Sequence, residues 1–257
     1  MNFSADTALP VEIRPSPNHN ERRGGKPPDM LLLHYTGMPD AQGALDRLCD
    51  PASEVSCHYF VFEDGRILQL VAEARRAWHA GVAAWAGERD INSRAIGIEI
   101  ANPGHDDAYP DFPEAQMQAV EALCRDIVAR RAITPERVLA HSDVAPRRKC
   151  DPGEKFDWAR LARAGVGLWV EPEPIRAGDD LRPGDTGPAV AGLQRDLARF
   201  GYALTVNAVY DEATRDVVTA FQRHFRQALV DGCADTSTLE MLEALLRLLM
   251  AGREPRP

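Results

Sequence analysis

The stretch Met30–Tyr35 reads MLLLHY and places one histidine at the end of a short apolar run. Consecutive apolar residues in a run of this length are typical of a buried β-strand. A second histidine opens the loop HSDVAPRRKCDPG at 141–153, which also contains an aspartate. Two imidazoles and one carboxylate form a complete three-ligand set for a catalytic zinc ion, which keeps its fourth position for water. The sequence therefore predicts a metal site with the ligands His34, His141 and Asp151.

Short apolar segments alternate with segments of helical period around this strand. The clearest helix is 113–131, where apolar residues recur at three- and four-residue steps. Strands interleaved with helices favour an α/β fold with a mixed central sheet flanked by helices. The expected strands are 30–35, 57–63, 67–71, 95–101 and 138–141, and the other expected helices are 41–49 and 156–164.

The composition changes after residue 165. Residues 171–174 read EPEP and 178–180 read GDD, which is typical of a stiff acidic linker. Beyond it, 187–197 and 214–225 share a Val-x-x-(Leu/Phe)-Gln core, and we expect a small three-helix domain there. Because the linker offers few residues able to pack, we expect a chain cut within 170–180 to leave a folded N-terminal part.

The charge balance of the chain excludes some classes of partner. Its 257 residues contain 30 Lys and Arg against 39 Asp and Glu, a net charge of −9. Binding to nucleic acid or to an anionic membrane surface needs a basic footprint, which is missing here. No segment approaches the ~20 apolar residues of a membrane span. We therefore expect neither nucleic acid nor membrane as a partner.

Cysteine usage and the first residues bear on the compartment. Five cysteines at irregular spacing, with no Cys-x-x-Cys pair, indicate reduced and mostly buried thiols rather than a disulfide framework. Residues 1–28 contain no apolar stretch of the length of a secretory signal. Both features favour a cytoplasmic location, with the periplasm as the alternative.

Five blocks in a fixed order resemble a known family. They are LHYT at 33–36, SCHY at 56–59, AWHAG at 77–81, IGIEI at 96–100 and the 141–153 loop. Over roughly residues 28–165 the chain resembles the zinc-dependent N-acetylmuramoyl-L-alanine amidases of the AmpD/AmiD-like group. Residues 180–246 resemble the three-helix peptidoglycan-binding domain that is often appended to wall hydrolases. The domains expected on this basis are an extended arm (1–28), a zinc amidase domain (29–165), a linker (166–180) and a peptidoglycan-binding-like domain (181–250).

The resemblance assigns chemistry to particular residues. It implies one zinc ion per chain on His34, His141 and Asp151, with Glu99 as general base and Lys149 stabilising the oxyanion. Some family members have a cysteine as the third ligand, so a swap of Asp151 for the adjacent Cys150 stays open. The phage enzyme's catalytic tyrosine aligns with Cys57 here, which shifts the acid–base work to Glu99.

The sequence alone also allows a structural role for each of the two proposed catalytic residues, Glu99 and Lys149. A carboxylate within an apolar strand is costly unless it faces a cleft, a partner or a metal site. The alternative for Glu99 is an acid paired for structural reasons, and for Lys149 a solvated surface lysine. Of the remaining histidines, we expect His58 to be structural and take His19, His105 and His224 as incidental. The expected substrate contacts are Tyr35, Trp78, His79, Asn102 and Arg148.

The function implied by the resemblance is hydrolysis of the amide between N-acetylmuramic acid and L-alanine in peptidoglycan or muropeptides. Two alternatives stay open. One is a non-catalytic peptidoglycan-recognition protein, and the other is a zinc peptidase that acts elsewhere on the stem peptide. We expect the protein to be a monomer.

Overall fold

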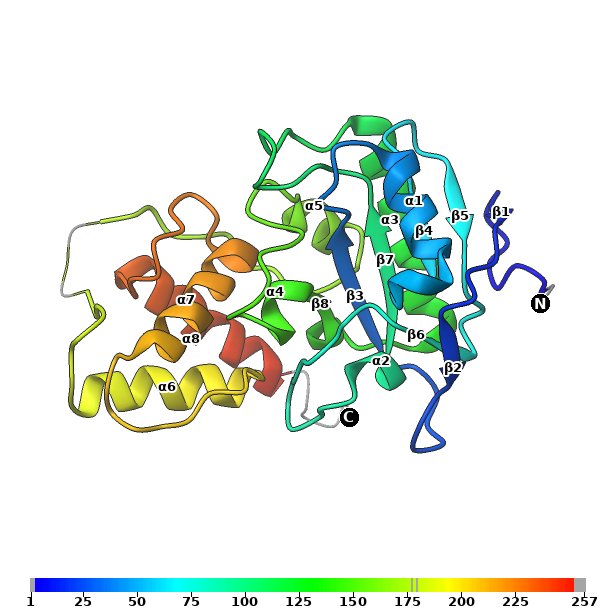
Figure 1. Cartoon of the computed structure of the whole chain (residues 1–257). Helices are drawn as coiled ribbons and strands as arrows, with labels where there is room; N and C mark the ends of the chain where they lie inside the picture. The colour runs from blue at the N-terminus through cyan, green and yellow to red at the C-terminus, as the bar shows by residue number, and fades with distance from the viewer. Residues whose placement is uncertain (1–2, 177, 179, 252–257) are drawn as a thin grey trace.

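The computed structural model describes residues 3–176, 178 and 180–251 (Figure 1). At its centre lies a six-stranded sheet in which β4 and β5 are antiparallel and the other neighbouring strands are parallel. The predicted mixed α/β sheet is therefore confirmed. Across the sheet the strands are β1 (Glu12–Ile13), β5 (Ile67–Gln69), β4 (Tyr59–Val61), β7 (Ala95–Ile100), β3 (Met30–Tyr35) and β8 (Val138–Ala140).

Most elements lie where periodicity placed them, with shifted ends. The expected hairpin strands are shorter than predicted, and the expected arm contributes two short strands of its own. β1 extends the main sheet beside β5, and β2 (His19–Glu21) pairs with β6 (Arg75–Ala77). The helices of this part are α1 (Ala41–Cys49), α2 (Ile91–Arg94), α3 (Glu114–Arg131), α4 (His141–Val144) and α5 (Trp158–Arg163), with 3₁₀ turns at Pro51–Ser53 and Pro135–Arg137.

One face of the sheet is closed by helices. Successive side chains of a strand point to opposite faces, so residues in register on neighbouring strands share a face. Leu31 and Leu33 of β3 are in register with Ile96 and Ile98 of β7. α3 and α5 cover this face, and their apolar residues form one buried cluster with these four side chains.

The opposite face is covered at two places and open between them. α1 packs over Phe60 of β4, and the C-terminal helices pack over Met30 and Leu32 of β3. His34 and Glu99 belong to this same face, and they are in register on β3 and β7. The functional side chains therefore stand at the carboxyl end of β3, between the two covers.

The C-terminal module, defined as residues 181–251, contains the predicted three helices. They are α6 (Pro188–Phe200), α7 (Glu212–Phe225) and α8 (Thr236–Ala251), and they lie beside the sheet domain in Figure 1. Asp211 begins α7 by accepting a hydrogen bond from the Thr214 amide at 2.9 Å, the usual contribution of an aspartate N-cap.

The C-terminal module packs directly against the sheet domain. A single apolar cluster contains Met30 and Trp85 of the sheet domain together with Phe200 and Phe221 of the module. The partly buried Leu168 and Val170 of the linker pack against this cluster too. The expectation that the linker offers few residues able to pack is therefore wrong. It was based on the acidic EPEP stretch at 171–174, whereas the apolar residues that pack lie directly before that stretch.

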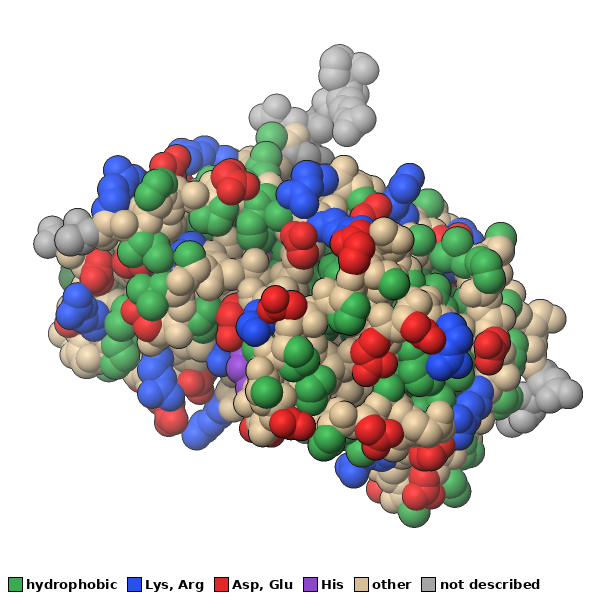
Figure 2. All heavy atoms as spheres, turned by 90° about the horizontal axis from the view of Figure 1, so that it is seen from above, with side chains coloured by type: hydrophobic (Ala, Val, Ile, Leu, Met, Phe, Trp, Pro, Cys, Tyr) green, Lys and Arg blue, Asp and Glu red, His purple; other side chains and the backbone are tan. Residues whose placement is uncertain are grey.

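The surface carries charges of both signs. On the face seen in Figure 2, basic and acidic side chains are interspersed and do not gather by sign. Across the described residues, no helix has the length and apolar character that crossing a bilayer requires.

Candidate active site

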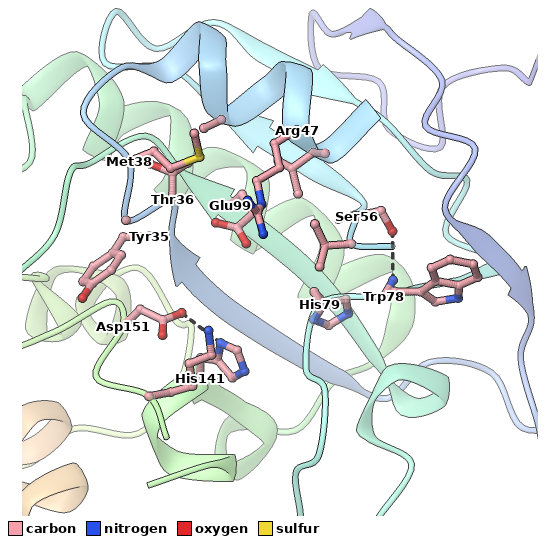
Figure 3. A pocket seen from close by; sticks show the side chains of 15 residues that line it. Tyr35, Thr36, Met38, Arg47, Ser56, Trp78, His79, Glu99, His141 and Asp151 are labelled. Carbon is pink, nitrogen blue, oxygen red and sulfur yellow. Dashed lines mark hydrogen bonds and ion pairs between the residues drawn. The ribbon is translucent and has the colours of Figure 1, made fainter. Parts of the chain in front are cut away.

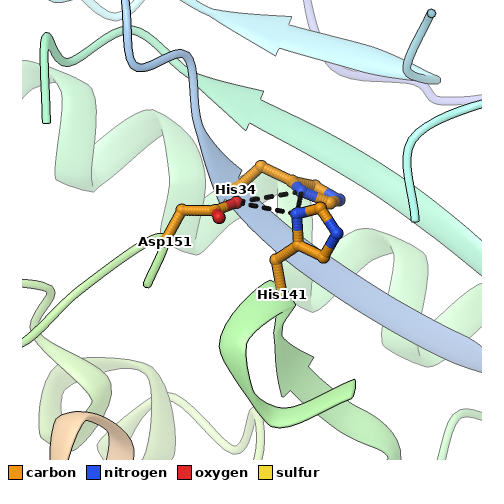
Figure 4. Close-up of side chains that lie close together, drawn as sticks. All are labelled: His34, His141 and Asp151. Atoms are coloured by element: carbon orange, nitrogen blue, oxygen red, sulfur yellow. Dashed lines mark hydrogen bonds and ion pairs between the residues drawn. The ribbon is translucent and has the colours of Figure 1, made fainter. Parts of the chain in front are cut away.

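The three predicted ligands meet at one edge of the sheet. His34 lies near the end of β3, and His141 begins α4 directly after β8. Because β3 and β8 are parallel neighbours, their carboxyl ends lie side by side. His34 Nδ1 is 2.9 Å from His141 Nδ1, and these two atoms are 3.1 and 3.0 Å from Asp151 Oδ2 (Figure 4). All three side chains are buried, and their ligand atoms form a group able to hold a metal ion.

The outer nitrogens of both imidazoles have partners outside this triad. His141 Nε2 donates to the Ala80 carbonyl at 3.1 Å, and His34 Nε2 lies 3.1 Å from His79 Nδ1. A neutral imidazole that carries its hydrogen on Nε2 has a bare acceptor at Nδ1. Two such nitrogens and a carboxylate oxygen then converge on one point. This donor set fits zinc, which binds imidazole nitrogen and carboxylate oxygen at ~2.0–2.2 Å.

Electrostatics favour the ligand forms of these groups. Burial, together with the nearby His141, lowers the pKa of His34 to about 4, so its ring is neutral at pH 7. Burial alone would raise the pKa of Asp151, but the charge and hydrogen bonds of a protonated His141 or His34 imidazole hold that pKa well below its usual range, so a proton shared among the three groups resides on an imidazole and the carboxylate stays ionised. Neutral imidazole and ionised carboxylate are the states that bind metals.

Glu99 stands beside the triad in an open cavity of about 390 Å³. Figure 3 shows Glu99 and Asp151 both pointing into this cavity. Within the described part of the chain, the buried Oε2 atom of Glu99 has no hydrogen-bond partner. Burial, reinforced by the charge of Asp151, raises the pKa of Glu99 well above its usual value, although Lys149 opposes the shift. A raised pKa makes the ionised carboxylate a stronger base than an exposed glutamate.

Four other predicted residues line the same cavity: Tyr35, Trp78, His79 and Lys149. The Tyr35 hydroxyl is 3.0 Å from the Cys150 thiol, and the exposed Lys149 side chain stands at the rim. The His79 ring is buried between His34 and His58, with edge-on contacts to both. His79 therefore contacts the predicted ligand His34 as well as lining the cavity.

Two predicted substrate contacts are engaged elsewhere. The Asn102 amide donates to the Pro110 carbonyl at 3.0 Å and accepts from the Gly104 amide at 2.9 Å, so it shapes the loop after β7. Arg148 donates to the carbonyls of Ala80 and Val82 and does not line the cavity.

Some residues that surround the site were missed by sequence reasoning. Arg47 of α1 lines the cavity and, within the described part of the chain, forms no ion pair. Its spacing of three residues from Ala44, which lines the same cavity, is a signal that could have found it, because residues three and four apart share a helix face. The expectation that His105 and His224 are incidental is wrong. The Tyr35 hydroxyl lies 3.0 Å from His105 Nδ1, and His224 is buried against the carboxylate of Asp143.

A His-His-Asp triad that could hold a metal ion, with a carboxyl group beside it at the carboxyl edge of a mixed sheet, is the arrangement expected of a hydrolase. The family model described as N-acetylmuramoyl-L-alanine amidase matches residues 24–154, and a model described as a peptidoglycan binding domain matches residues 186–242. The chain belongs to the N-acetylmuramoyl-L-alanine amidase family, whose members hydrolyse the amide between N-acetylmuramic acid and L-alanine in peptidoglycan turnover or recycling.

The chain is similar to amidases of the AmiD and AmpD types. It is 40% identical to the N-acetylmuramoyl-L-alanine amidase AmiD of Escherichia coli over 229 residues, covering 84% of this chain and 82% of that protein. It is 31% identical to the 1,6-anhydro-N-acetylmuramyl-L-alanine amidase AmpD of Enterobacter cloacae, over 57% of this chain and 86% of that one.

Solved structures agree in fold. The E. coli AmiD complex with the substrate anhydro-N-acetylmuramic acid-L-Ala-D-γ-Glu-L-Lys matches with a TM-score of 0.75 and 36% identity, over 90% of this chain and 98% of that chain. AmpDh3 from Pseudomonas aeruginosa in complex with anhydromuramic pentapeptide matches with a TM-score of 0.72 and 31% identity, over 97% and 99%.

Proposed function

We propose that the chain holds one zinc ion on His34, His141 and Asp151, and that Glu99 is the general base of amide hydrolysis. The observation that carries this proposal is the convergence of three potential ligand atoms next to a cavity into which Glu99 points, with its Oε2 atom lacking a hydrogen-bond partner among the described residues. A zinc ion in this site would polarise the amide carbonyl and lower the pKa of a water molecule.

The residues of the chain divide the remaining work. Glu99 accepts the proton of the attacking water and passes it to the departing amine of L-alanine. Lys149 at the rim places a positive charge near the developing oxyanion, where such a charge stabilises the transition state. His79 orients the imidazole of His34, a support that ligating histidines commonly receive from a hydrogen-bonding neighbour.

The substrate follows from the relatives and from the charges of the cavity. We propose a muropeptide, the class of ligand named in the AmiD and AmpDh3 complexes. The stem peptide carries carboxylates, and Arg47 and Lys149 supply cations at the cavity. We assign residues 29–165 to catalysis and residues 181–250 to contact with peptidoglycan, and we propose a monomer.

Product analysis tests the reaction. Digestion of an anhydro-muropeptide should release a free stem peptide that begins with L-alanine, together with the intact muramic sugar, as seen by mass spectrometry. A digest of intact sacculus run beside it measures whether the anhydro form is required. Cleavage inside the stem peptide would identify a peptidase instead. Tight binding without any product would identify a recognition protein.

The metal is tested separately. The purified chain should contain about one zinc ion, lose activity with chelator and regain it with added zinc. His141→Ala should abolish tight zinc binding, because two ligands do not hold a tetrahedral site. Full activity of the metal-free protein would contradict the proposal.

A further inference from the structure

A carboxylate directly behind the metal triad is shared between the sheet domain and the C-terminal module. Asp143 is the third residue of α4, the short helix that His141 begins. Its side chain is fully buried. One oxygen accepts from the Tyr202 hydroxyl at 2.7 Å, and the other accepts from the Ala140 amide and from His224 Nδ1, both at 2.7 Å.

The two side-chain donors to Asp143, Tyr202 and His224, both come from the C-terminal module. Tyr202 follows α6, and His224 lies in the last turn of α7. Each is buried, with 2% of its surface exposed, and each is packed against a tryptophan of the sheet domain. The Tyr202 ring meets Trp85 edge-on at 4.9 Å, and the His224 ring stacks on Trp158 at 3.7 Å. This environment fixes both donors in place.

The hydrogen bond from the outer nitrogen of His141 also depends on contacts with the C-terminal module. Its Nε2 donates to the Ala80 carbonyl, which belongs to the loop 79–88. That loop is anchored at Trp85, whose ring lies so close to Gly201 that a Cβ there would come within 2.5 Å of it. The amide of the next residue, Ala86, donates to the Gly201 carbonyl at 2.7 Å. Both the backbone and the outer nitrogen of His141 are thus held through contacts with the module.

Helix α4 needs such external support. It has four residues, and a helix of one turn has no stability of its own in water. The position of His141 therefore depends on what holds α4 in place. A buried carboxylate that lost its donors would have to move toward water or recruit new partners, because leaving it without hydrogen bonds is costly.

We infer that the C-terminal module is a structural part of the metal site, and that Tyr202 and His224 are positioning residues for the ligand His141. This inference rests on the proposed zinc site. It gives the module a task inside the catalytic domain that is separate from any contact with peptidoglycan. Zinc affinity then depends on side chains that approach neither the metal nor the substrate.

The test measures the zinc dissociation constant of full-length variants by competition with a chromogenic chelator. Tyr202→Phe keeps the ring against Trp85 and removes one donor, so zinc should bind about 10-fold more weakly, the lower end of the range for hydrogen-bond partners of metal ligands. His224→Ala should have a similar effect. His224→Asn should restore part of the affinity, because the asparagine amide can donate from near the position of Nδ1.

Tyr210→Phe is the matched control. Tyr210 is also buried in the module, and its hydroxyl donates to the Gly232 carbonyl at 2.8 Å without touching the sheet domain. This variant should lose thermal stability as Tyr202→Phe does, while its zinc dissociation constant stays within about twofold of the unchanged chain. The inference is overturned if Tyr202→Phe and His224→Ala lower the melting temperature but bind zinc as tightly as this control. Absence of tight zinc binding in the unchanged chain would instead refute the proposed function.

Discussion

At the scale of single residues, the decisive feature is the carboxyl group of Glu99. Glu99 stands on an otherwise apolar strand, in register with His34, and its buried oxygen Oε2 has no hydrogen-bond partner within the described residues. Glu73 offers the contrast. Its buried carboxylate is fully bonded by Tyr59, Arg130 and Arg131, as expected of an acid with a structural function.

Changing Glu99→Gln separates chemistry from binding. The amide keeps the size of the side chain but cannot accept the proton, so kcat should fall by about 10²–10⁴-fold. Zinc content and KM should stay nearly unchanged, because the ligands and the cavity are intact. Steady-state kinetics and metal analysis check both statements. A variant that loses zinc would make Glu99 a support of the metal instead of the base.

The buried carboxylate of Glu73 should make the free energy of unfolding depend on pH. Burial would raise its pKa, but hydrogen bonds from Arg130 and Tyr59 and the arginine charges hold the pKa below its usual value. A depressed folded-state pKa means that its stabilisation is complete above the unfolded value of about 4.3 and is lost as the pH falls through the folded value. Urea unfolding from pH 7 to pH 3 should show this loss, and Glu73→Gln should reduce it. Glu63→Gln, a change at an exposed acid, should leave the pH profile unaltered.

At the scale of elements, the glycine in strand β7 leaves room for the ring of His79. A Cβ at Gly97 would come within 2.6 Å of the His79 ring, so the ring occupies the space above this glycine. His79 in turn contacts the outer nitrogen of His34. Because residue 97 has no side chain, the His79 ring fits against β7 and contacts His34, the proposed metal ligand on the neighbouring strand.

Gly97→Ala should therefore destabilise the protein by about 1–3 kcal/mol, as overpacking a tight core does. It should also weaken zinc binding, because the His79 ring must move away from His34. Gly192→Ala is the control, since the added Cβ on α6 would have ordinary space and alanine is the better helix former. Thermal unfolding and zinc competition of both variants test this, and unchanged zinc binding in Gly97→Ala would count against the bracing contact.

At the scale of the whole molecule, the two parts share one apolar core. Trp85 is buried against Phe200 and Tyr202, and the linker residues Leu168 and Val170 pack on the same cluster. Cutting the chain within 170–180 would expose several of these side chains, each worth about 1.5–3 kcal/mol when fully buried. The N-terminal fragment should melt at least about 10 °C below the full chain or aggregate. Equal melting temperatures would show that the parts are independent after all.

The sequence by itself determined the sheet, the ligand triad and the acid beside it. These features depend on local signals: an apolar run that ends in histidine, the three- and four-residue period of 113–131, and a loop that holds His141 and Asp151 ten positions apart. Parallel neighbouring strands then bring their carboxyl ends together without further information. For these features, residue type and short spacing were sufficient.

Only the tertiary structure decided what supports the site. Asp143 meets Tyr202 and His224 across 59 and 81 positions, and no local period signals such a contact. For the same reason, the diversion of Asn102 and Arg148 to backbone carbonyls and the packing of the linker were not predicted. A buried polar group selects its partner by proximity in the folded chain, and that proximity is set by the packing of whole elements.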